Sequence, residues 1–553
     1  MNRHWDRSYN PLMRIAIGQI NTNVGAFEQN RSRILTYVQE ARSLQCDLVV
    51  FPELAVCGCA PLDSIWRPGY VAACAETLEA VRASSEGIGV VVGCITTGES
   101  RRGIDACSAA GLSDRRDLEL FNTAVLIEDE RVIGRAPKIH LSSQGVRHEH
   151  RYYSAGPGSE VFAFRGRTLG LSIQEDAWSL DGPTALQASL GADWIINVSA
   201  SPFCLGKSAI VRRLIRDRAK ENRVGIVHAN LVGGQDGTVF DGGSFIVDAE
   251  GRLLFQSPRF AEGLFVCDLA EPHSVAPETP NDLVSLRSAL TMGIRDYVTK
   301  NGFESVLIGL SGGIDSALVA ALAVDALGSE HVACAYLPSS FSSEQSREDA
   351  EEIARRLSIE LLEISIADIH QTMRNALPEV PTGLTDENLQ PRIRATLWMA
   401  LASQRRALVL CAGNKSEIAM GYSTLYGDTT GALAPIGDLY KTDVYRLAEL
   451  FAEWIPRRVF DRPPTAELRP DQRDEDDLPP YSRLDALLRD LIEGNRSRTE
   501  LISAGFEEAL VDRVLTAYHR CEHKRSQLPP VLGVTSKPFG TGRRMPITHA
   551  YNG

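Results

Sequence analysis

One six-residue segment constrains this chain more than any other feature. The segment 311–316 (SGGIDS) directly follows the apolar run 306–310 (VLIGL) and directly precedes a helical pattern. Glycines let the backbone approach phosphate oxygens closely, and hydroxyls at a helix N-terminus add hydrogen-bond donors and a favourable dipole. No Gly-Lys-Ser/Thr follows, so this is not a Walker A loop. The segment predicts a strand–loop–helix site for phosphate groups rather than a plain turn.

The pattern around this loop predicts a parallel sheet. Residues 286–300 and 317–327 have helical periodicity, whereas 305–309 and 332–336 are short apolar strands. Strand, helix and strand in this order form a βαβ unit. The N-terminal half also alternates, with a helix over 26–44 and strands over 13–20, 47–51, 88–93, 124–127, 170–173, 194–198 and 225–229. We therefore expect an α/β fold with layered sheets.

A proline-rich stretch separates the two halves. Residues 271–282 (EPHSVAPETPND) contain three prolines and several turn formers, which predicts a linker. We place the domains at 1–270 and 284–553, with the linker over 271–283. At roughly 100–200 residues per domain, 553 residues are enough for two cores. The acidic, proline-bounded segment 469–480 predicts either a solvated loop or a part of the active site, with equal weight.

Bulk composition argues against several classes of partner. The net charge of −13 disfavours a nucleic-acid or anionic-membrane surface. No apolar run approaches the ~18 residues of a membrane span, and the N-terminus lacks signal-peptide features. Eleven thinly spread cysteines suit reduced thiols, so we expect a cytoplasmic protein. Cys57 and Cys59 form a C-x-C without a second ligand pair, which disfavours a zinc site.

The loop 311–316 resembles the SGGxDS loop of the N-type ATP pyrophosphatases. In that family the loop holds the pyrophosphate that leaves when a substrate oxygen attacks the α-phosphate of ATP. The family includes NAD, GMP, asparagine and argininosuccinate synthetases and tRNA-thiolating enzymes. The resemblance implies a doubly wound, adenine nucleotide α-hydrolase-like sheet and adenylation chemistry, and it leaves the substrate open.

Downstream motifs select the NAD synthetases among these enzymes. The segment 387–394 (ENLQPRIR) resembles their ENxQxRIR motif, and the resemblance continues in order over nearly all of 284–545. Further matching segments are 338–343 (PSSFSS), 413–417 (GNKSE), 421–428 (GYSTLYGD), 438–442 (DLYKT), 464–468 (PTAEL), 478–481 (LPPY) and 524–525 (KR). The resemblance implies that ATP adenylates the carboxylate of nicotinic acid adenine dinucleotide (deamido-NAD), and that ammonia then displaces AMP.

The resemblance also implies roles for the matching residues. The ATP-contacting residues would be Gly309, Leu310, Ser311, Gly312, Gly313, Ile314, Asp315, Ser316 and Ala412. Those contacting deamido-NAD would be Asn388, Glu417, Tyr422, Asp428 and Lys524. Asp315 and Glu417 would hold Mg²⁺, because hard carboxylate oxygens suit that ion. Lys441, Thr465 and Asp315 would be catalytic, with Lys441 and Thr465 stabilising charge on the phosphates during adenylation. A homo-oligomer with a synthetase-domain dimer core is implied as well.

One position of the synthetase half departs from the family pattern. The family usually has Thr before GNKSE, at an ATP-contacting position, where this chain has Ala412. The lost hydroxyl predicts an affinity cost near that of one hydrogen bond, ~0.5–1.5 kcal/mol.

Residues 13–270 resemble the nitrilase-like amidase domain of the glutamine-dependent NAD synthetases, which implies a four-layered αββα fold. Segments 51–54 (FPEL) and 135–138 (RAPK) match those with the catalytic Glu and Lys, here Glu53 and Lys138; 233–236 (GGQD) and 240–244 (FDGGS) match later motifs. In that family a Cys attacks the glutamine amide, the Glu activates the thiol and the Lys stabilises the oxyanion.

The expected nucleophile position holds Gln174 instead. The family's C-E-D-x-W segment reads QEDAW over 174–178, and its LPNYGVFDE segment reads LSSQGVRHE over 141–149. Gln144 therefore replaces the Tyr that lines the glutamine pocket, whereas Glu149, Ser201 and Lys207 match the family. An amide cannot form the thioester, so we predict a remnant of a glutaminase site.

Three hypotheses remain open at this point. The first is an NAD synthetase that uses free ammonia and carries a pseudo-glutaminase domain as a scaffold or regulator. The second is glutamine-dependent synthesis through a displaced thiol, such as Cys57, Cys59 or Cys204, or through a partner glutaminase. The third is a non-catalytic regulatory paralogue, against which the intact synthetase motifs argue.

Overall fold

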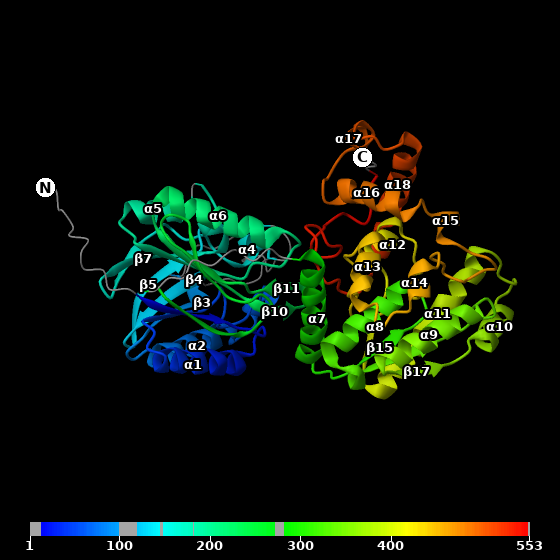
Figure 1. Cartoon of the computed structure of the whole chain (residues 1–553), viewed down its shortest axis with the longest axis horizontal. Helices are drawn as coiled ribbons and strands as arrows, with labels where there is room; N and C mark the ends of the chain where they lie inside the picture. The colour runs from blue at the N-terminus through cyan, green and yellow to red at the C-terminus, as the bar shows by residue number, and fades with distance from the viewer. Residues whose placement is uncertain (1–12, 99–118, 144–146, 181, 271–280, 551–553) are drawn as a thin grey trace, which may run out of the picture. The chain divides into compact units, whose positions relative to one another are not determined.

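The computed structural model describes residues 13–98, 119–143, 147–180, 182–270 and 281–550 (Figure 1). These residues fall into two compact units. Unit 1 contains the described residues up to 235 and those of 240–270, and unit 2 contains Asp236–Val239 and the described residues from 281 onward. The linker predicted at 271–283 lies, up to residue 280, outside the described residues, so the domain boundaries stay a prediction.

Unit 1 is built on two six-stranded sheets. The first has the order β14-β1-β2-β3-β4-β5, with β1 Arg14–Gln19, β2 Leu48–Val50, β3 Gly89–Thr97, β4 Leu120–Glu128, β5 Arg131–Pro137 and β14 Gly263–Asp268. The second has the order β13-β12-β9-β8-β7-β6, with β6 Val161–Phe164, β7 Arg167–Ile173, β8 Trp194–Ser199, β9 Gly225–Asn230, β12 Phe245–Val247 and β13 Leu253–Gln256. β1–β3 and β7–β9 pair in parallel and the outer strands are antiparallel.

Helices cover the outer face of each sheet, while the inner faces pack on each other. The shared core contains Ile15, Ile17 and Val50 from the first sheet and Leu171 and Val198 from the second. Helices α1 (Phe27–Ser43) and α2 (Tyr70–Ala83) pack on the first sheet, and α5 (Pro183–Ser189) and α6 (Lys207–Asn222) pack on the second. Figure 1 shows these four layers in order. The predicted αββα fold is confirmed.

Unit 2 contains a four-stranded parallel sheet of order β17-β16-β15-β18, with β15 Val306–Gly309, β16 Val332–Tyr336, β17 Glu360–Glu363 and β18 Leu408–Leu410. Strands β15, β16 and β18 are almost wholly apolar because helices cover them, whereas the edge strand β17 has an exposed glutamate at each end. The helices that pack on the strands include α8 (Ile314–Leu327), α9 (Glu344–Leu357) and α11 (Leu384–Arg405), and α7 (Asp282–Lys300) packs on α8. The chain runs from β15 outward to β17 and then returns to β18 on the other side of β15, which is the doubly wound order.

A small helical cluster follows the sheet. Helices α12 (Lys415–Met420), α16 (Tyr481–Ile492), α17 (Arg498–Ser503) and α18 (Glu508–Arg520) share one apolar core. The remaining elements are α4 (Glu149–Tyr152), α10 (Ala367–Ala376), α13 (Lys441–Ala448), α14 (Arg457–Asp461), α15 (Asp474–Asp477), α19 (Glu522–Arg525), the hairpin β10 (Val232–Gln235) and β11 (Thr238–Asp241), and the 3₁₀ turns η1 (Leu62–Trp66), η2 (Gln174–Ala177), η3 (Ser329–His331) and η4 (Glu449–Phe451). None of the described helices is long and apolar enough to cross a membrane.

The strands and helices predicted from the sequence all occur in the structure. Each predicted strand overlaps one of β1, β2, β3, β4, β7, β8, β9, β15 or β16, and the helix predicted over 26–44 is α1. The predicted strands do not include β5, β6, β10–β14, β17 and β18, most of which have only three or four residues. Some of them, such as β13 and β14, have mostly half-exposed side chains, so no clear alternation of buried and exposed residues marks them in the sequence.

Candidate functional site

A candidate site of unit 2 lies where the strand order reverses. Parallel sheets of this kind bind ligands beyond the carboxyl ends of the strands, at the switch point between neighbouring loops. Here the loops after β15 and β18 meet, and both line a cavity of about 280 Å³. Of the predicted site residues, the cavity walls include Gly309, Leu310, Ser311, Gly312, Gly313, Ile314, Asp315, Ser316, Ala412, Glu417, Tyr422, Asp428, Lys441 and Thr465.

The loop between β15 and α8 has the form expected of an anion site. Its amides and hydroxyls form a compact turn, in which the amide of Ser311 donates to Ser316 Oγ at 3.2 Å and Ser316 Oγ donates to Gly313 O at 3.1 Å. Gly312 has a φ of 80°, and a Cβ there would lie 2.4 Å from the carbonyl oxygen of Ser346. A glycine is therefore required, and the N-terminus of α8 faces the cavity with its positive dipole end.

A compact charge cluster forms the floor of the cavity. Asn414 caps α12 and makes a capping box with Glu417, which fixes that carboxylate. The side-chain amide of Asn414 donates to Asp315 at 3.0 Å. Lys441, the first residue of α13, is 2% exposed, forms an ion pair with Asp315 and lies 3.6 Å from Glu417. The SGGIDS, GNKSE and DLYKT motifs thus contribute two carboxylates and one ammonium group to the same cluster.

Carboxylates outnumber cations in this cluster. Burial, together with the nearby Asp315 and Asp474, raises the pKa of Glu417 to about 8 against the opposing effect of Lys441. Burial raises the pKa of Asp474, a cavity residue from the segment 469–480, as well. Although burial disfavours its charged form, Asp315 and Glu417 raise the pKa of Lys441. The acidic segment therefore contributes to the site rather than being only a solvated loop.

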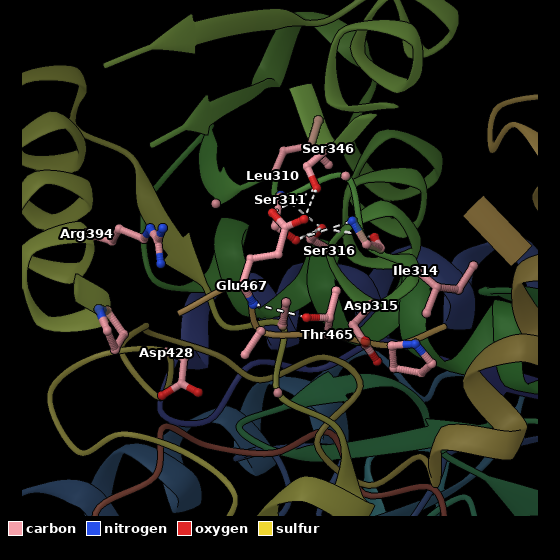
Figure 2. Close-up of a pocket in the computed structure, with 18 of the residues that line it drawn as sticks. Leu310, Ser311, Ile314, Asp315, Ser316, Ser346, Arg394, Asp428, Thr465 and Glu467 are labelled. Atoms are coloured by element: carbon pink, nitrogen blue, oxygen red, sulfur yellow. Dashed lines mark hydrogen bonds between the residues drawn. The ribbon is translucent and has the colours of Figure 1, made fainter. Parts of the chain in front are cut away.

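The opposite wall of the cavity contains an arginine that sequence reasoning missed. Arg394 comes from α11, and Figure 2 shows it on the same side of the cavity as Asp428, across from the loop at Ser311. Its Nε donates to the carbonyl oxygen of Leu337 at 2.9 Å. Burial lowers the pKa of Arg394 to about 10, although Glu467 and Asp428 oppose that shift. Arg394 belongs to the ENLQPRIR motif, so its position in that motif was the available signal.

Two predicted site residues, Asn388 and Lys524, lie outside the cavity lining. The hydroxyl of Thr424 donates to Asn388 Oδ1 at 2.7 Å, and Lys524 donates to the carbonyl oxygens of Gly421 and Ser423 at 2.8 and 2.6 Å. Both side chains therefore hold the 421–428 loop, other residues of which do line the cavity. The hydrogen bonds described for the Asn388 and Lys524 side chains are with residues of this loop.

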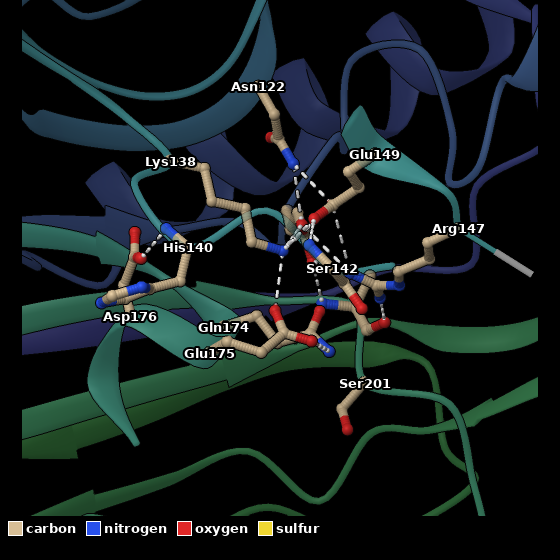
Figure 3. A network of polar contacts seen from close by, with 12 residues as sticks. Asn122, Lys138, His140, Ser142, Arg147, Glu149, Gln174, Glu175, Asp176 and Ser201 are labelled. Carbon is tan, nitrogen blue, oxygen red and sulfur yellow. Dashed lines mark hydrogen bonds and ion pairs between the residues drawn. The ribbon is translucent and has the colours of Figure 1, made fainter. Parts of the chain in front are cut away.

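Unit 1 contains a second cluster, at the ends of strands β2, β5 and β7. Lys138 and Glu53 are fully buried. Lys138 Nζ lies 3.3 Å from Glu53 Oε1, 2.8 Å from Glu149 Oε2 and 2.7 Å from Glu175 Oε2 (Figure 3). Asn122 donates to Glu53 at 2.8 Å, and so does the amide of Ala200 at 2.9 Å. Glu53, Lys138 and Glu149, which match family residues in the sequence, therefore lie together in the fold.

Arg147 forms a further, unpredicted part of this cluster. Its Nη1 lies 3.1 Å from Glu53 Oε2, its Nη2 donates to the carbonyl oxygen of Ala200, and only 5% of its surface is exposed. Against the effect of burial, Arg147 and Lys138 lower the pKa of Glu53 to about 2. A carboxyl group held at this pKa is a weak proton acceptor. The available signal was the loss of the family's Phe at position 147, but the sequence did not reveal the partner of Arg147, which is 94 residues away.

Gln174 lies at the turn from β7 into η2, at the edge of the same cluster (Figure 3). Its φ is 44°, in the left-handed region that non-glycine residues rarely adopt and that is enriched at functional sites. The side chain is 1% exposed, and its amide nitrogen donates to Glu175 Oε1 at 3.1 Å. A neutral amide therefore occupies a strained strand-to-helix turn beside Lys138 and Glu175. Gln144, the other predicted change, lies outside the described residues.

The thiols considered as substitutes differ in exposure. Cys57 and Cys59 are buried, and burial raises the pKa of Cys59 to about 12 although Arg147 opposes that rise. A hydrogen bond with Cys74, together with burial, raises the pKa of Cys57. Such thiols stay protonated, and the thiolate is the nucleophile. Cys204 is half-buried and hydrogen bonded to the carbonyl oxygen of Leu205.

Comparisons with known proteins match both halves of the chain. The NAD synthase family model matches residues 286–528, and the carbon-nitrogen hydrolase model matches 14–272. A glutamine-dependent NAD(+) synthetase from Synechocystis sp. is 37% identical over 98% of this chain and 99% of its own length, and one from Aquifex aeolicus is 36% identical over 98% and 100%.

Solved structures of glutamine-dependent NAD(+) synthetases also match this chain over nearly its whole length. The glutamine-dependent NAD+ synthetase from Acinetobacter baumannii in complex with ADP has a TM-score of 0.75 at 32% identity, covering 97% of this chain and 98% of its own. A glutamine-dependent NAD(+) synthetase from Cytophaga hutchinsonii shares the fold with a TM-score of 0.81 at 21% identity, over 98% of each chain. With relatives matched over nearly their whole length, the chain belongs to the glutamine-dependent NAD(+) synthetase family, whose members are carbon–nitrogen ligases.

Proposed function

We propose that this NAD synthetase amidates deamido-NAD through an acyl-adenylate and takes its nitrogen from free ammonia rather than from glutamine. The synthetase cavity supports the ligase activity, since its phosphate loop, its lysine and its carboxylates are all present. The observation that carries the choice of ammonia is the Arg147–Glu53 ion pair beside the amide of Gln174. In this proposal Gln174 replaces the nucleophilic Cys, and Arg147 binds the carboxylate that would activate a thiol.

In the first step, the carboxylate of deamido-NAD attacks the α-phosphorus of ATP, and the bond to pyrophosphate breaks. The nucleophile is already an anion, so no general base is needed. The amides and hydroxyls of the 311–316 loop and the ammonium of Lys441 take up the charge of the leaving pyrophosphate. Thr465 and Arg394 face the same cavity and would neutralise phosphate charge from the other walls.

Asp315 and Glu417, which both pair with Lys441, would hold Mg²⁺ through carboxylate oxygens, the ligands that this ion prefers, although the described residues contain no group of three or more such ligands already gathered around one point. When bound there, Mg²⁺ supplies charge neutralisation to the phosphate oxygens.

In the second step, neutral ammonia attacks the acyl carbon, the bond to the AMP oxygen breaks, and the nitrogen loses a proton. Water would hydrolyse the same intermediate, so the site must exclude it. Leu310, Trp398 and Leu468 give the cavity apolar walls that serve this purpose, while Tyr422 and Asp428 would bind the dinucleotide.

The decisive test measures NAD formation by the purified protein with ATP, Mg²⁺ and deamido-NAD, with saturating ammonium or glutamine in parallel. We expect NAD with ammonium and none with glutamine. The relatives are glutamine-dependent, which favours the alternative; comparable rates with glutamine, lost on thiol alkylation, would establish it. No NAD from either source would show a non-catalytic paralogue.

A single substitution tests the ATP site. Ala412 lines the cavity, and Ala412→Thr would restore the hydroxyl expected at an ATP-contacting position. One hydrogen bond contributes about 0.5–1.5 kcal/mol, so we expect the KM for ATP to fall by about 2- to 10-fold with kcat unchanged. Steady-state kinetics with ammonium measures this, and Ala412→Val, which has the same shape without the hydroxyl, is the control. Equal KM values for the two variants would contradict the predicted contact.

A further inference from the structure

The carboxylate of Glu467 is surrounded by hydrogen-bond donors that have no role in the proposed mechanism so far. Ser343 Oγ donates to Glu467 Oε1 at 2.7 Å, and Ser346 Oγ lies 2.9 Å from both carboxylate oxygens. The backbone amide of Ser343 adds a contact at 3.3 Å, and Arg462 forms an ion pair with Oε1. Ser346 is 2% exposed, whereas Ser343 and Arg462 are half-buried, so the donors lie between the interior and the open cavity.

These donors lie against the phosphate loop. Gly312 approaches the carbonyl oxygen of Ser346 so closely that a Cβ would lie 2.4 Å away. Ser346, Arg462 and Glu467 line the same cavity as the loop 311–316, and Figure 2 shows the Glu467 carboxylate between Ser346 and Ser311. The donors therefore continue the phosphate-binding surface of the loop.

The chemistry of this cluster suits a phosphate group as well as a carboxylate. Two hydroxyls, a guanidinium and the first turn of α9, a 14-residue helix, all favour an anion with several acceptor oxygens. Glu467 reaches them from the segment 462–468 with a φ of 49°, in the left-handed region that costs free energy for a glutamate. A side chain held in that way at an anion subsite stands where phosphate oxygens would otherwise bind.

We propose that Ser343, Ser346 and Arg462 form a subsite for the terminal phosphates of ATP, which leave as pyrophosphate, and that the Glu467 carboxylate occupies it when no nucleotide is bound. The inference rests on the proposed function, because it assumes that ATP binds at the 311–316 loop. Pyrophosphate and Glu467 compete for the same donors. Binding of the terminal phosphates therefore releases the segment 462–468, and return of Glu467 displaces pyrophosphate after adenylation.

The test measures the affinity of the full-length protein for inorganic pyrophosphate with Mg²⁺ by calorimetry. If Glu467 occupies the subsite for about nine-tenths of the time, its removal raises the apparent affinity by about 10-fold. We expect this gain in Glu467→Gln, which keeps the side-chain shape, and in Glu467→Ala. Pyrophosphate should also increase hydrogen exchange of the amides of 462–468 in the unchanged protein.

The matched control is Asp349→Asn. Asp349 lies 3.7 Å from the guanidinium of Arg462, so the substitution removes one negative charge beside the same arginine without touching the serine hydroxyls. We expect less than a 2-fold change in pyrophosphate affinity for this variant. Equal gains in both variants, or an unchanged or weaker affinity in the Glu467 variants, would overturn the inference alone. No pyrophosphate binding by any of the proteins would overturn the proposed function with it.

Discussion

Replacement of Lys441 by methionine is expected to lower the rate of NAD formation with ammonium by about 100- to 1000-fold, the range for removal of one preorganised charge-stabilising group. Lys441 is the cation between Asp315 and Glu417, and the side chain is almost fully buried. Its ammonium is therefore fixed before substrates bind. The loss should appear in kcat at saturating ATP, because the phosphate loop still binds the nucleotide and the missing charge matters most when pyrophosphate leaves.

Two further variants separate chemistry from folding. Lys441→Arg keeps the charge but not the compact ammonium, so it should recover only part of the rate. Lys537→Met removes a half-buried lysine side chain whose described contact is a 3.4 Å hydrogen bond to Asn495, and it should leave kcat unchanged. Thermal unfolding of each variant checks that the fold persists. A folded Lys441→Met protein with more than about one-tenth of the original rate would contradict the catalytic role.

The second large effect concerns unit 1. Gln174→Cys alone is expected to produce no measurable glutaminase, because Arg147 still binds Glu53 and keeps its pKa near 2. A free thiol has a pKa near 8.5, so Glu53 in that state takes up its proton poorly. Gln174→Cys combined with Arg147→Phe, the residue that the related family has there, should raise glutamate release by about 100-fold over the single variant.

One control variant tests whether the glutamate release depends on the thiol, and alkylation tests the thiol directly. Gln174→Ala with Arg147→Phe has the same opened site without a thiol and should release no glutamate. Activity of the double variant that combines Gln174→Cys with Arg147→Phe should disappear on thiol alkylation. Equal glutamate release from the single and double variants would show that Arg147 does not restrain Glu53.

Local motifs made much of unit 2 predictable. The SGGIDS segment specifies much of its own geometry, because the φ of 80° at Gly312 favours glycine and Ser316 hydrogen bonds to Ser311 and Gly313 within the segment. The Asn and Glu of GNKSE form a capping box three residues apart. Motifs of this kind carry their structural cause within a few residues. Their order along the chain then placed most of the predicted residues in one cavity.

The contacts that the sequence did not reveal join residues that lie far apart along the chain. The Arg147–Glu53 contact joins residues 94 positions apart, and Ser346 meets Glu467 across 121 positions. Neither arginine nor glutamate has a local pattern that specifies its partner. Asn388 and Lys524 show the converse, since their motifs predicted ligand contacts while their described partners are atoms of the 421–428 loop.

The buried ions of unit 1 limit how this region can change in evolution. Removing one member of a buried charge group leaves its partners uncompensated, at a cost of about 3–5 kcal/mol, which is a large share of a domain's stability. Glu53, Lys138 and Arg147 therefore hold one another in place whether or not the site turns over substrate. A neutral neighbour such as Gln174 is free of that constraint. Replacing Arg147 alone is therefore expected to cost more stability than replacing Gln174, even though the related family has an uncharged residue at position 147.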